Sequence, residues 1–355
     1  MSRDDWTLAG VFEVAPGIHR IVCPLPGDGL KAVNVYAIED GDGLALVDTG
    51  WRSDAILAAL TDGFATLGAR LSDLTAIVST HSHYDHYGLS AHLRELSGAP
   101  VYLGEHERAN LGSAIVREEF DRYLADRRAL LLRHGARTLA DELAGIGFTF
   151  EQVQRRGFAT WPDHWVADGE RLEVGGRVLV AHLTPGHSRG HLMFLADDLL
   201  FAGDHVLPHI TPSLGFEAFT DGHALQAFLA SLHASRDLPA RLVLPGHGPV
   251  FEDLSGRVDE LLAHHDTRLA ACVAALAGGP LTAHEVAGRL TWTRRERPFA
   301  DMDLFNRMLA TTETITHLEL LADRDAATRE QDGEVVRYVA VSTVWSKTSA
   351  PSSIL

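Results

Sequence analysis

Short apolar runs divided by turn residues open the chain. The segments "IHRIVCPL", "AVNVYAIE" and "GLALVDT" lie within residues 18–49, and "PGDG" and "DGDG" separate them. β-favouring runs with Gly and Asp between them are typical of antiparallel strands. We therefore predict several antiparallel strands at the start of the fold.

The period of the apolar positions then changes. Residues 53–68 have helical spacing, "LTAIVST" at 74–80 has the pattern of a buried strand, 88–98 is again helical, and "PVYLG" at 100–104 is another short apolar run. Strand, helix and strand in succession indicate an α/β layer.

A charged segment follows, over residues 105 to about 150. It is amphipathic with helical spacing, which predicts a helical insertion within about 105–160. Two interpretations stay open: a solvated helical excursion, or a helical lid over a pocket. The segment also contains Arg127, Arg128, Arg133 and Arg137. These arginines either contact an anionic substrate group or pair with Asp121, Asp126 and Asp141.

Strand patterns return at 177–186, 191–198, 199–206 and 240–248, with a helical pattern at 224–236 before the last of them. A long helical pattern from 254 ends at Gly278-Gly279-Pro280, a stop signal that suggests a domain boundary. Beyond it the pattern predicts two helices and a β ribbon. We predict a main domain over 1–278, a small domain over 279–345 and a tail over 346–355.

Composition and charge narrow the function classes. Of 355 residues 46% are hydrophobic and 22% charged, which fits a globular protein. The net charge of −17 disfavours binding to phosphate backbones. No run resembles a signal peptide or a membrane span, and Cys23 and Cys272 are too few for a disulfide framework. We expect a cytoplasmic protein that does not associate with membranes.

The stretch "STHSHYDHYG", residues 79–88, concentrates metal-ligand residue types. It follows the predicted strand at 74–80 and contains His81, His83, Asp85 and His86. Side chains at i and i+2 of an extended segment point the same way, so His81 and His83 can hold one cation, and Asp85 and His86 can face a second. Imidazole with carboxylate suits zinc, and also iron or manganese.

Three later strand patterns also end in ligand-type residues. "TPGHSRGH" contains His187, "FAGDHV" contains Asp204, and "VLPGHGP" contains His247. Functional residues of layered α/β folds collect where strands end. The seven residues together therefore predict a metal centre.

These motifs, with "VDTG" at 47–50, resemble the metallo-β-lactamase fold hydrolases in the branch similar to glyoxalase II, over roughly residues 10–265. The resemblance implies a four-layer αββα sandwich with a helical insertion and two metal ions, most often zinc. It implies His81, His83 and His187 for the first ion. It implies Asp85, His86 and His247 for the second, with Asp204 bridging. True β-lactamases usually have Cys or Ser at the bridging place, so antibiotic hydrolysis is disfavoured.

The expected chemistry is attack by a metal-activated hydroxide on a polarised carbonyl or phosphoryl group. Asp85 is the candidate catalytic residue, to orient the nucleophile or accept its proton. Tyr87 either contacts substrate or packs under the loop, and His205 has a pocket or supporting role. His191 either braces the loop that carries His187 or is a core histidine. The apolar loop 208–219 is interpreted as a pocket wall.

The C-terminal region resembles the small winged-helix domain of some hydrolases of this fold. Its candidate recognition helix carries Glu313, Glu319 and Asp323 against Arg307 and Arg324. Phosphate contacts need clustered cations, and the basic group at Arg294, Arg295 and Arg297 is interrupted by Glu296. We therefore expect packing, homodimer formation or pocket closure, and no nucleic-acid binding.

The function predicted from these observations is a dinuclear hydrolase of a small-molecule acyl substrate, first a thioester or activated ester. A lactonase is the alternative for the same attack, and a phosphodiesterase or nuclease of this fold is a third. A metal-dependent winged-helix regulator is the alternative that is not an enzyme.

Overall fold

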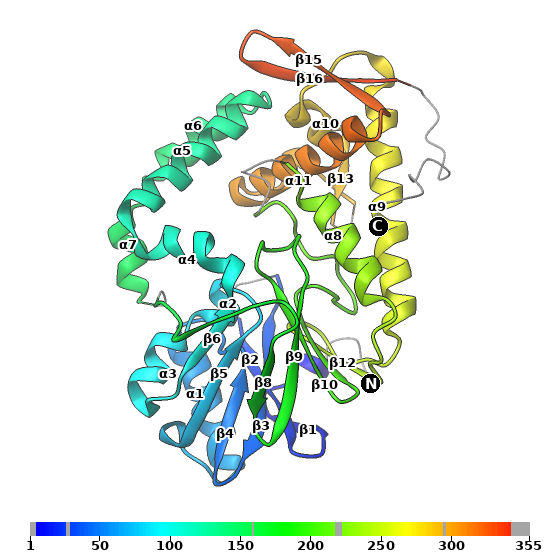
Figure 1. Cartoon of the computed structure of the whole chain (residues 1–355). Helices are drawn as coiled ribbons and strands as arrows, with labels where there is room; N and C mark the ends of the chain where they lie inside the picture. Colours follow the sequence, from blue (N-terminus) through cyan, green and yellow to red (C-terminus); the bar gives the residue numbers. More distant parts are fainter. Residues whose placement is uncertain (1–4, 26–28, 158–159, 217–221, 294–295, 342–355) are drawn as a thin grey trace. The chain divides into compact units, whose positions relative to one another are not determined.

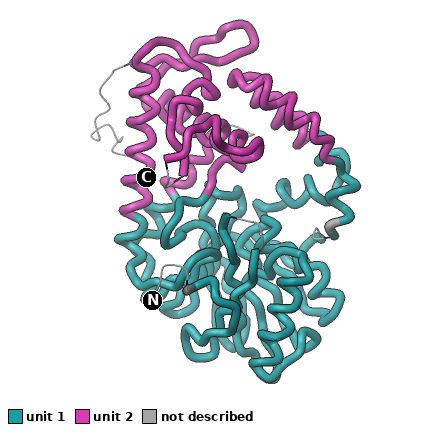
Figure 2. Tube along the Cα trace, turned by 180° about the vertical axis from the view of Figure 1, so that it is seen from behind, with its two compact units in different colours: residues 1–121, 149–212, 231–258 teal, residues 122–148, 213–230, 259–355 magenta. Residues whose placement is uncertain are grey.

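The computed structural model describes residues 5–25, 29–157, 160–216, 222–293 and 296–341 (Figure 1). The chain forms two compact units (Figure 2). Unit 1 comprises residues 1–121, 149–212 and 231–258, and unit 2 comprises residues 122–148, 213–230 and 259–355.

The first sheet of unit 1 has seven strands in the order of the chain. The first four strands pair antiparallel, as predicted, and β4 to β7 pair parallel. The strands are β1 (Val11–Ala15), β2 (Ile18–Pro24), β3 (Ala32–Asp40), β4 (Gly43–Val47), β5 (Leu74–Ser79), β6 (Val101–Gly104) and β7 (His164–Val166).

The second sheet has five strands in the order β12-β11-β10-β9-β8. All neighbours pair antiparallel except β11 and β12, which are parallel, so these two strands end at the same edge of the sheet. The strands are β8 (Arg171–Val174), β9 (Arg177–Leu183), β10 (Leu192–Ala196), β11 (Leu199–Gly203) and β12 (Leu242–Pro245).

Two apolar layers hold unit 1 together. Alternate residues of both sheets form a shared core, in which the Tyr36 and Phe201 rings meet edge to face with centroids 5.6 Å apart. On the other face of the first sheet, helices α1 (Asp54–Thr66) and α3 (Ser90–Ser97) bury residues such as Phe64 and Leu93. The predicted α/β sandwich is confirmed.

Short helices complete unit 1 and continue into unit 2. The predicted helical insertion consists of η3 (Glu105–Glu107), α4 (Arg108–Ile115), α5 (Arg117–Arg133), α6 (Arg137–Gly145) and α7 (Phe150–Arg156). The remaining short elements are η1 (Asp5–Thr7), η2 (Leu71–Asp73) and α2 (Tyr84–Tyr87). Arg128 pairs with Asp141 at 2.9 Å on the exposed surface, which fits the ion-pair alternative for this arginine.

Unit 2 is mainly helical. Its longest complete helix, α11 (Leu304–Asp323), begins at Asp303, whose side chain accepts a hydrogen bond from the Asn306 N–H at 2.8 Å. Met308 packs with Leu131 and Leu139 from the α5–α6 hairpin. The other elements are α8 (Ala224–Ser235) and α9 (Leu254–Ala275), which begin or end in unit 1, then η4 (Leu276–Gly278), α10 (Ala283–Arg289), β13 (Thr291–Trp292), β14 (Arg297–Pro298), η5 (Phe299–Asp301), β15 (Ala327–Asp332) and β16 (Val335–Ala340).

The helices and the ribbon predicted beyond residue 279 are present, whereas the winged-helix designation and the boundary at 278/279 stay predictions. The compact units divide elsewhere, because unit 2 also takes in residues 122–148 and the end of α9. Arg294, Arg295 and the tail at 346–355 lie outside the described residues. None of the described helices combines the length and apolarity needed to cross a bilayer.

Candidate metal centre

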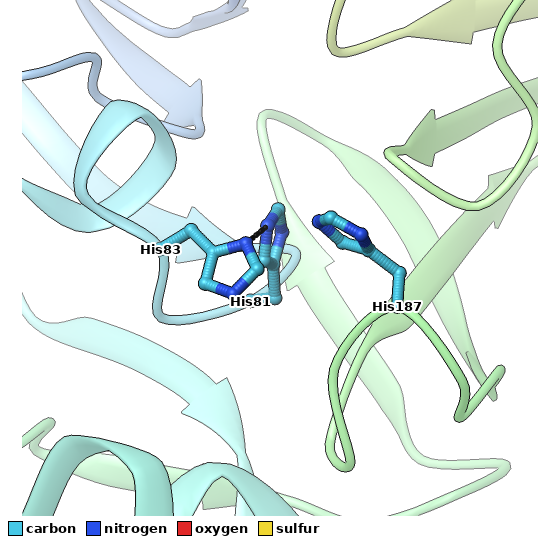
Figure 3. Close-up of side chains that lie close together, drawn as sticks. All are labelled: His81, His83 and His187. Atoms are coloured by element: carbon cyan, nitrogen blue, oxygen red, sulfur yellow. Dashed lines mark hydrogen bonds between the residues drawn. The ribbon is translucent and has the colours of Figure 1, made fainter. Parts of the chain in front are cut away.

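The loop after β5 places the first histidines. The Thr80 hydroxyl lies 3.0–3.1 Å from both carboxylate oxygens of Asp48 and 3.0 Å from His81 Nδ1. Because a hydroxyl has one proton to give, the Thr80 hydroxyl that donates to Asp48 accepts from His81 Nδ1–H. His81 Nε2 then carries a lone pair, which lies 3.0 Å from His83 Nδ1 (Figure 3).

Asp48, the acid of the "VDTG" turn, supports the same loop from β4. Its backbone has the left-handed φ of 62°, and its carboxylate accepts from the Thr80 N–H at 2.8 Å and from His86 Nδ1 at 2.8 Å. Thr49 adds two hydrogen bonds to the His86 carbonyl, at 2.7 and 2.9 Å. His86 is therefore fixed with Nε2 directed away from Asp48, free to act as a ligand.

The second sheet contributes the remaining side chains at its strand ends. His187 follows β9, Asp204 follows β11 and His247 follows β12. His247 Nδ1 donates to the Ala32 carbonyl at 2.7 Å, which leaves Nε2 as the basic nitrogen. Gly246 is required here, because a Cβ at this residue would lie 2.5 Å from Asp204 Oδ1 and 2.6 Å from His86 Cε1.

His191 supports the predicted bridging carboxylate. Its Nδ1 lies 2.8 Å from the Thr184 hydroxyl, and its Nε2 accepts from the Asp204 backbone N–H at 3.0 Å. Burial lowers the pKa of His191 well below its ordinary value, in keeping with a neutral ring. His191 is thus a buried, hydrogen-bonded histidine that holds the backbone of Asp204.

Glu107, which belongs to none of the predicted ligand motifs, joins the two loops that carry His81, His83 and His187. Its fully buried carboxylate accepts from the Ser82 N–H at 3.2 Å, from the Gly190 N–H at 2.9 Å, and from the hydroxyls of Ser82 and Ser188. The charged segment, for which a solvated helical excursion and a helical lid both stayed open, therefore supplies an internal anchor. The sequence signal was only an acid beside an amphipathic helix.

Asn34 is a second supporting residue without a sequence signal. Its amide nitrogen donates to the carbonyls of Pro245 and Gly248, at 2.9 and 2.8 Å. The Tyr36 hydroxyl also donates to the Pro245 carbonyl at 2.9 Å. Strand β3 thereby fixes the turn that presents His247.

The structure brings all seven predicted ligands together. Three groups have their ligand atoms within 4.8 Å of one another: His81, His83 and His187; His81, His86 and Asp204; and Asp85, His86 and His247. Asp204 Oδ1 lies 3.5 Å from His86 Nε2, while Oδ2 lies 3.6 Å from His187 Nε2 and 3.5 Å from His247 Nε2. Figure 3 shows His81, His83 and His187 with their rings turned toward a common space.

The donor set fits a transition metal. Ligand atoms 2.0–2.1 Å from a tetrahedral zinc lie roughly 3.3 Å apart. The 3.0 Å between His81 and His83 and the 3.2 Å between His247 Nε2 and Asp85 Oδ2 are near this spacing. His86 Nε2, His247 Nε2 and Asp204 Oδ1 are buried and make no hydrogen bond within the described part of the chain. Buried polar atoms without a hydrogen bond reduce the stability of the folded state unless a bound ligand, such as a metal ion, interacts with them.

Charge divides the centre into two parts. Burial lowers the pKa of His83 to about 4, and burial with neighbouring imidazoles holds that of His81 well below its ordinary value. Burial also opposes protonation of His247, but Asp204 and Asp85 outweigh it and raise its pKa to about 10. Burial raises the pKa of Asp204, but His247 and His86 outweigh it and hold this pKa well below its usual range. The carboxylate side therefore attracts positive charge, which a divalent cation can supply in place of protons.

The two residues predicted to contact substrate lie in buried positions. Tyr87 has no exposed surface; it packs with the apolar residues around α1 and α3, and its hydroxyl donates to the Thr160 carbonyl at 3.0 Å. His205 is also fully buried, with Nε2 3.4 Å from the Ser235 hydroxyl. Substrate contact by either side chain does not fit these positions. The alternatives fit them: packing under the loop for Tyr87 and a supporting place for His205.

The apolar loop 208–219 is only partly described. Its beginning is tied to α9, because Arg257 donates to the carbonyls of Leu207 and Ile210 at 2.6 and 2.9 Å. Residues 217–219 lie outside the described part of the chain. Its interpretation as a pocket wall stays a prediction.

Known proteins share this sequence pattern and this fold. The family model described as the metallo-beta-lactamase superfamily matches residues 28–247, more than half of the chain. This chain belongs to the metallo-beta-lactamase superfamily. The relationship confirms the predicted fold class, and it makes the chain a hydrolase-type enzyme whose His and Asp cluster fits metal binding.

Solved structures of the metallo-beta-lactamase fold cover nearly the whole chain. A metallo-beta-lactamase family protein from Thermus thermophilus is 35% identical with a TM-score of 0.77, over 92% of this chain and 100% of that one. A beta-lactamase domain protein from Burkholderia ambifaria is 26% identical with a TM-score of 0.73, over 94% of this chain and 97% of that one. Among curated relatives, the lactamase-like protein adaB of Aspergillus niger is 26% identical over 76% of this chain and 67% of its own length. These comparisons do not distinguish a glyoxalase II-like branch.

Proposed function

We propose that this chain is a dinuclear metal-dependent hydrolase that attacks an activated carbonyl group, first of all an acyl thioester or ester. Zinc is the first candidate ion, with iron and manganese as alternatives. His81, His83 and His187 would hold one ion, and Asp85, His86 and His247 the other. Asp204 would bridge, and the approach of its two oxygens to His86, His187 and His247 is the observation that carries the proposal.

Divalent ions bound there would polarise a substrate carbonyl and make a water molecule acidic enough to serve as the nucleophile near neutral pH. Asp85 is proposed to orient the nucleophile and accept its proton. Its side chain is 20% exposed, against 8% or less for Asp204, His86 and His247, so it is the most accessible of these ligands to solvent and substrate. The buried residues would hold their positions and exclude water.

The substrate proposal rests on the bridging residue and on charge. Asp204 stands where β-lactamases usually carry Cys or Ser, which supports an ester or thioester over a lactam. The net charge of −17 opposes a long polyanionic substrate. A lactonase is the second candidate, because a cyclic ester needs the same attack.

We also propose a small-molecule acyl substrate in place of nucleic acid. The candidate recognition helix α11 buries Thr311, Thr312, Ile315, Leu318 and other residues within its own unit. Arg307 of this helix pairs with Glu142 at 3.0 Å. A helix whose side chains are buried and paired in this way has little exposed surface to contact a DNA groove. Packing or homodimer formation is therefore the proposed role of the region.

Two measurements test the proposal. Elemental analysis of protein purified without chelator should approach two equivalents of metal per chain. A stoichiometry of zero, without uptake on titration, would remove the mechanism. Matched thioester, lactone and phosphodiester substrates should then rank in that order by kcat/KM at fixed metal content. A phosphodiester that ranks first would refute the substrate assignment and favour the phosphodiesterase alternative, and tight sequence-selective DNA binding would favour a regulator.

A further inference from the structure

A cavity of about 560 Å³ lies in unit 1 beside the turn that follows β4. Its lining includes Trp51, Arg52, Leu89, His92 and Arg155. It is distinct from the ligand cluster, because none of the seven candidate ligands is part of this lining.

The cavity shares its wall with the loop that carries the candidate ligands. The Leu89 N–H donates to the Gly50 carbonyl at 3.2 Å. A Cβ on Gly88 would lie 3.0 Å from both the Arg52 nitrogen and the Gly50 oxygen, so the two backbones are in direct contact. The Trp51 ring lies 6.4 Å from that of Tyr84, which sits between ligands His83 and Asp85 in the sequence. A molecule in this cavity is therefore next to the loop that presents Asp85 and His86.

The two arginines of the cavity make no ion pair with a carboxylate within the described residues. Within the described residues, Arg155 and His92 make no hydrogen bond or ion pair, and Arg52 donates to the Gly157 carbonyl instead of to an acid. The chain has 48 acidic and 31 basic residues, so two arginines of one lining that both lack a carboxylate partner are notable. Asp54 is the one acidic residue of this lining. Two guanidinium groups that lack a carboxylate partner offer charge-assisted hydrogen bonds to an anion.

Trp51 adds a flat apolar surface to this cationic cavity. Its side chain is 36% exposed although it is one of the largest apolar groups of the chain. Indole rings stack on planar heterocycles such as the bases of nucleic acids. The cavity therefore combines a stacking surface with anion donors.

We propose that this cavity binds the phosphorylated nucleoside of an acyl carrier, of the kind found in a coenzyme A thioester. The phosphates would contact Arg52 and Arg155, and the adenine ring would stack on Trp51. This inference rests on the proposed thioester hydrolysis, since it places the carrier of that thioester beside the metal loop. It leaves the catalytic residues unchanged and assigns substrate choice to residues outside the metal centre.

Calorimetric titration of the metal-loaded chain with adenosine 3′,5′-bisphosphate tests the site directly. Arg52→Gln and Arg155→Gln should each weaken binding about tenfold, because each removes a charge-assisted hydrogen bond. Arg70→Gln is the matched control: it removes the same charge from an exposed arginine that pairs with Asp73, and binding should change less than twofold. Trp51→Leu should weaken the bisphosphate about fivefold or more and leave pyrophosphate unaffected.

Kinetics with two benzoyl thioesters separates this inference from the proposed function. Arg52→Gln and Arg155→Gln should raise KM for benzoyl coenzyme A about tenfold and leave kcat unchanged. Turnover of benzoyl N-acetylcysteamine, which has the thioester but no nucleotide, should be unaffected. No bisphosphate binding, or equal effects of Arg52→Gln and Arg70→Gln, would overturn the site. If wild-type protein hydrolyses neither thioester, the proposed function itself fails.

Discussion

Buried histidines occur in both compact units, but in different chemical settings. In unit 1, five histidines belong to the three ligand groups, and nitrogens of His86, His187 and His247 lie 3.2–3.8 Å from carboxylate oxygens of Asp85 or Asp204. In unit 2, His265 and His317 are equally buried, and His265 Nδ1 lies 3.2 Å from His317 Nε2. Burial and contact between imidazoles are thus common to both sets.

Nearby negative charge separates the two sets. His317 Nδ1 donates to the Glu313 carbonyl at 2.8 Å, so its Nε2 is the acceptor for His265 Nδ1–H. The pair is therefore neutral, and the Phe228 ring packs edge-on against His265 at 5.5 Å, although His265 Nε2 is buried and makes no hydrogen bond within the described residues. In unit 1, His86 and His247 use Nδ1 for support and direct Nε2 toward the carboxylates of Asp85 and Asp204. A site is recognised by converging lone pairs and negative charge, whereas buried histidines alone do not indicate one.

Replacement of the shared carboxylate should have the largest effect. Asp204→Asn removes the charge that approaches both histidine groups, so we expect metal content to fall and kcat/KM to drop by at least about 100-fold. Elemental analysis and thioester kinetics measure both. Asp198→Asn, an exposed acid paired with Arg241 at 2.6 Å, serves as the control. Normal metal content and turnover in Asp204→Asn would show that this carboxylate is not a shared ligand.

Replacement of Glu107 should weaken metal binding by His81, His83 and His187 more than metal binding by the other ligands. Glu107→Gln keeps the size of the side chain but offers one acceptor oxygen to the N–H groups of Ser82 and Gly190, so the two loops lose their common partner. We expect affinity for one metal equivalent to fall about 10–100-fold while the other is retained. Competition with a chromophoric chelator measures each equivalent. Glu105→Gln, two residues earlier and half exposed, should behave as wild type.

Replacement of a buried histidine of unit 2 should reduce stability without reducing metal content. His317→Leu removes a buried ring and its hydrogen bonds, so we expect a loss of about 1–3 kcal/mol in the free energy of unfolding. Metal content and thioester turnover should stay within twofold of wild type, because the pair holds no ion in our interpretation. Chemical denaturation and elemental analysis give the two values. A variant with normal stability and less metal would contradict a purely structural role for the His265–His317 pair.

The pH dependence of stability should test whether His317 is neutral in the folded state. Burial lowers the pKa of His317 to about 3, against about 6.5 in an unfolded chain. Between pH 6.5 and 3 the unfolded state binds a proton that the folded state does not, so stability falls as pH falls through this window. The slope per histidine is up to about 1.4 kcal/mol per pH unit. His317→Leu should remove one such slope, measured as free energy of unfolding between pH 6.5 and 4.5, and an unchanged slope would contradict a neutral His317.

Much of the fold was accessible from the sequence because its signals are local. The runs at 18–49 became β2 to β4 and "LTAIVST" became β5, with the ligand-type residues directly after the strands. Alternation and turn residues act over a few positions, so one sequence suffices to place them. The compact units were not accessible in the same way, since unit 2 combines three separate stretches of chain.

The sequence by itself determined which residue types stand at the strand ends, and it carried the family in the spacing of those motifs. Only the tertiary structure decided how each imidazole is oriented. Glu107 reaches Ser82 over 25 residues and Ser188 over 81, and Asn34 reaches Pro245 over 211. It also decided that Tyr87 faces the apolar core and that Trp51 is exposed beside Arg52. Hydrogen bonds and burial of this kind depend on which segments meet in space, and no local pattern of apolar and polar residues encodes that.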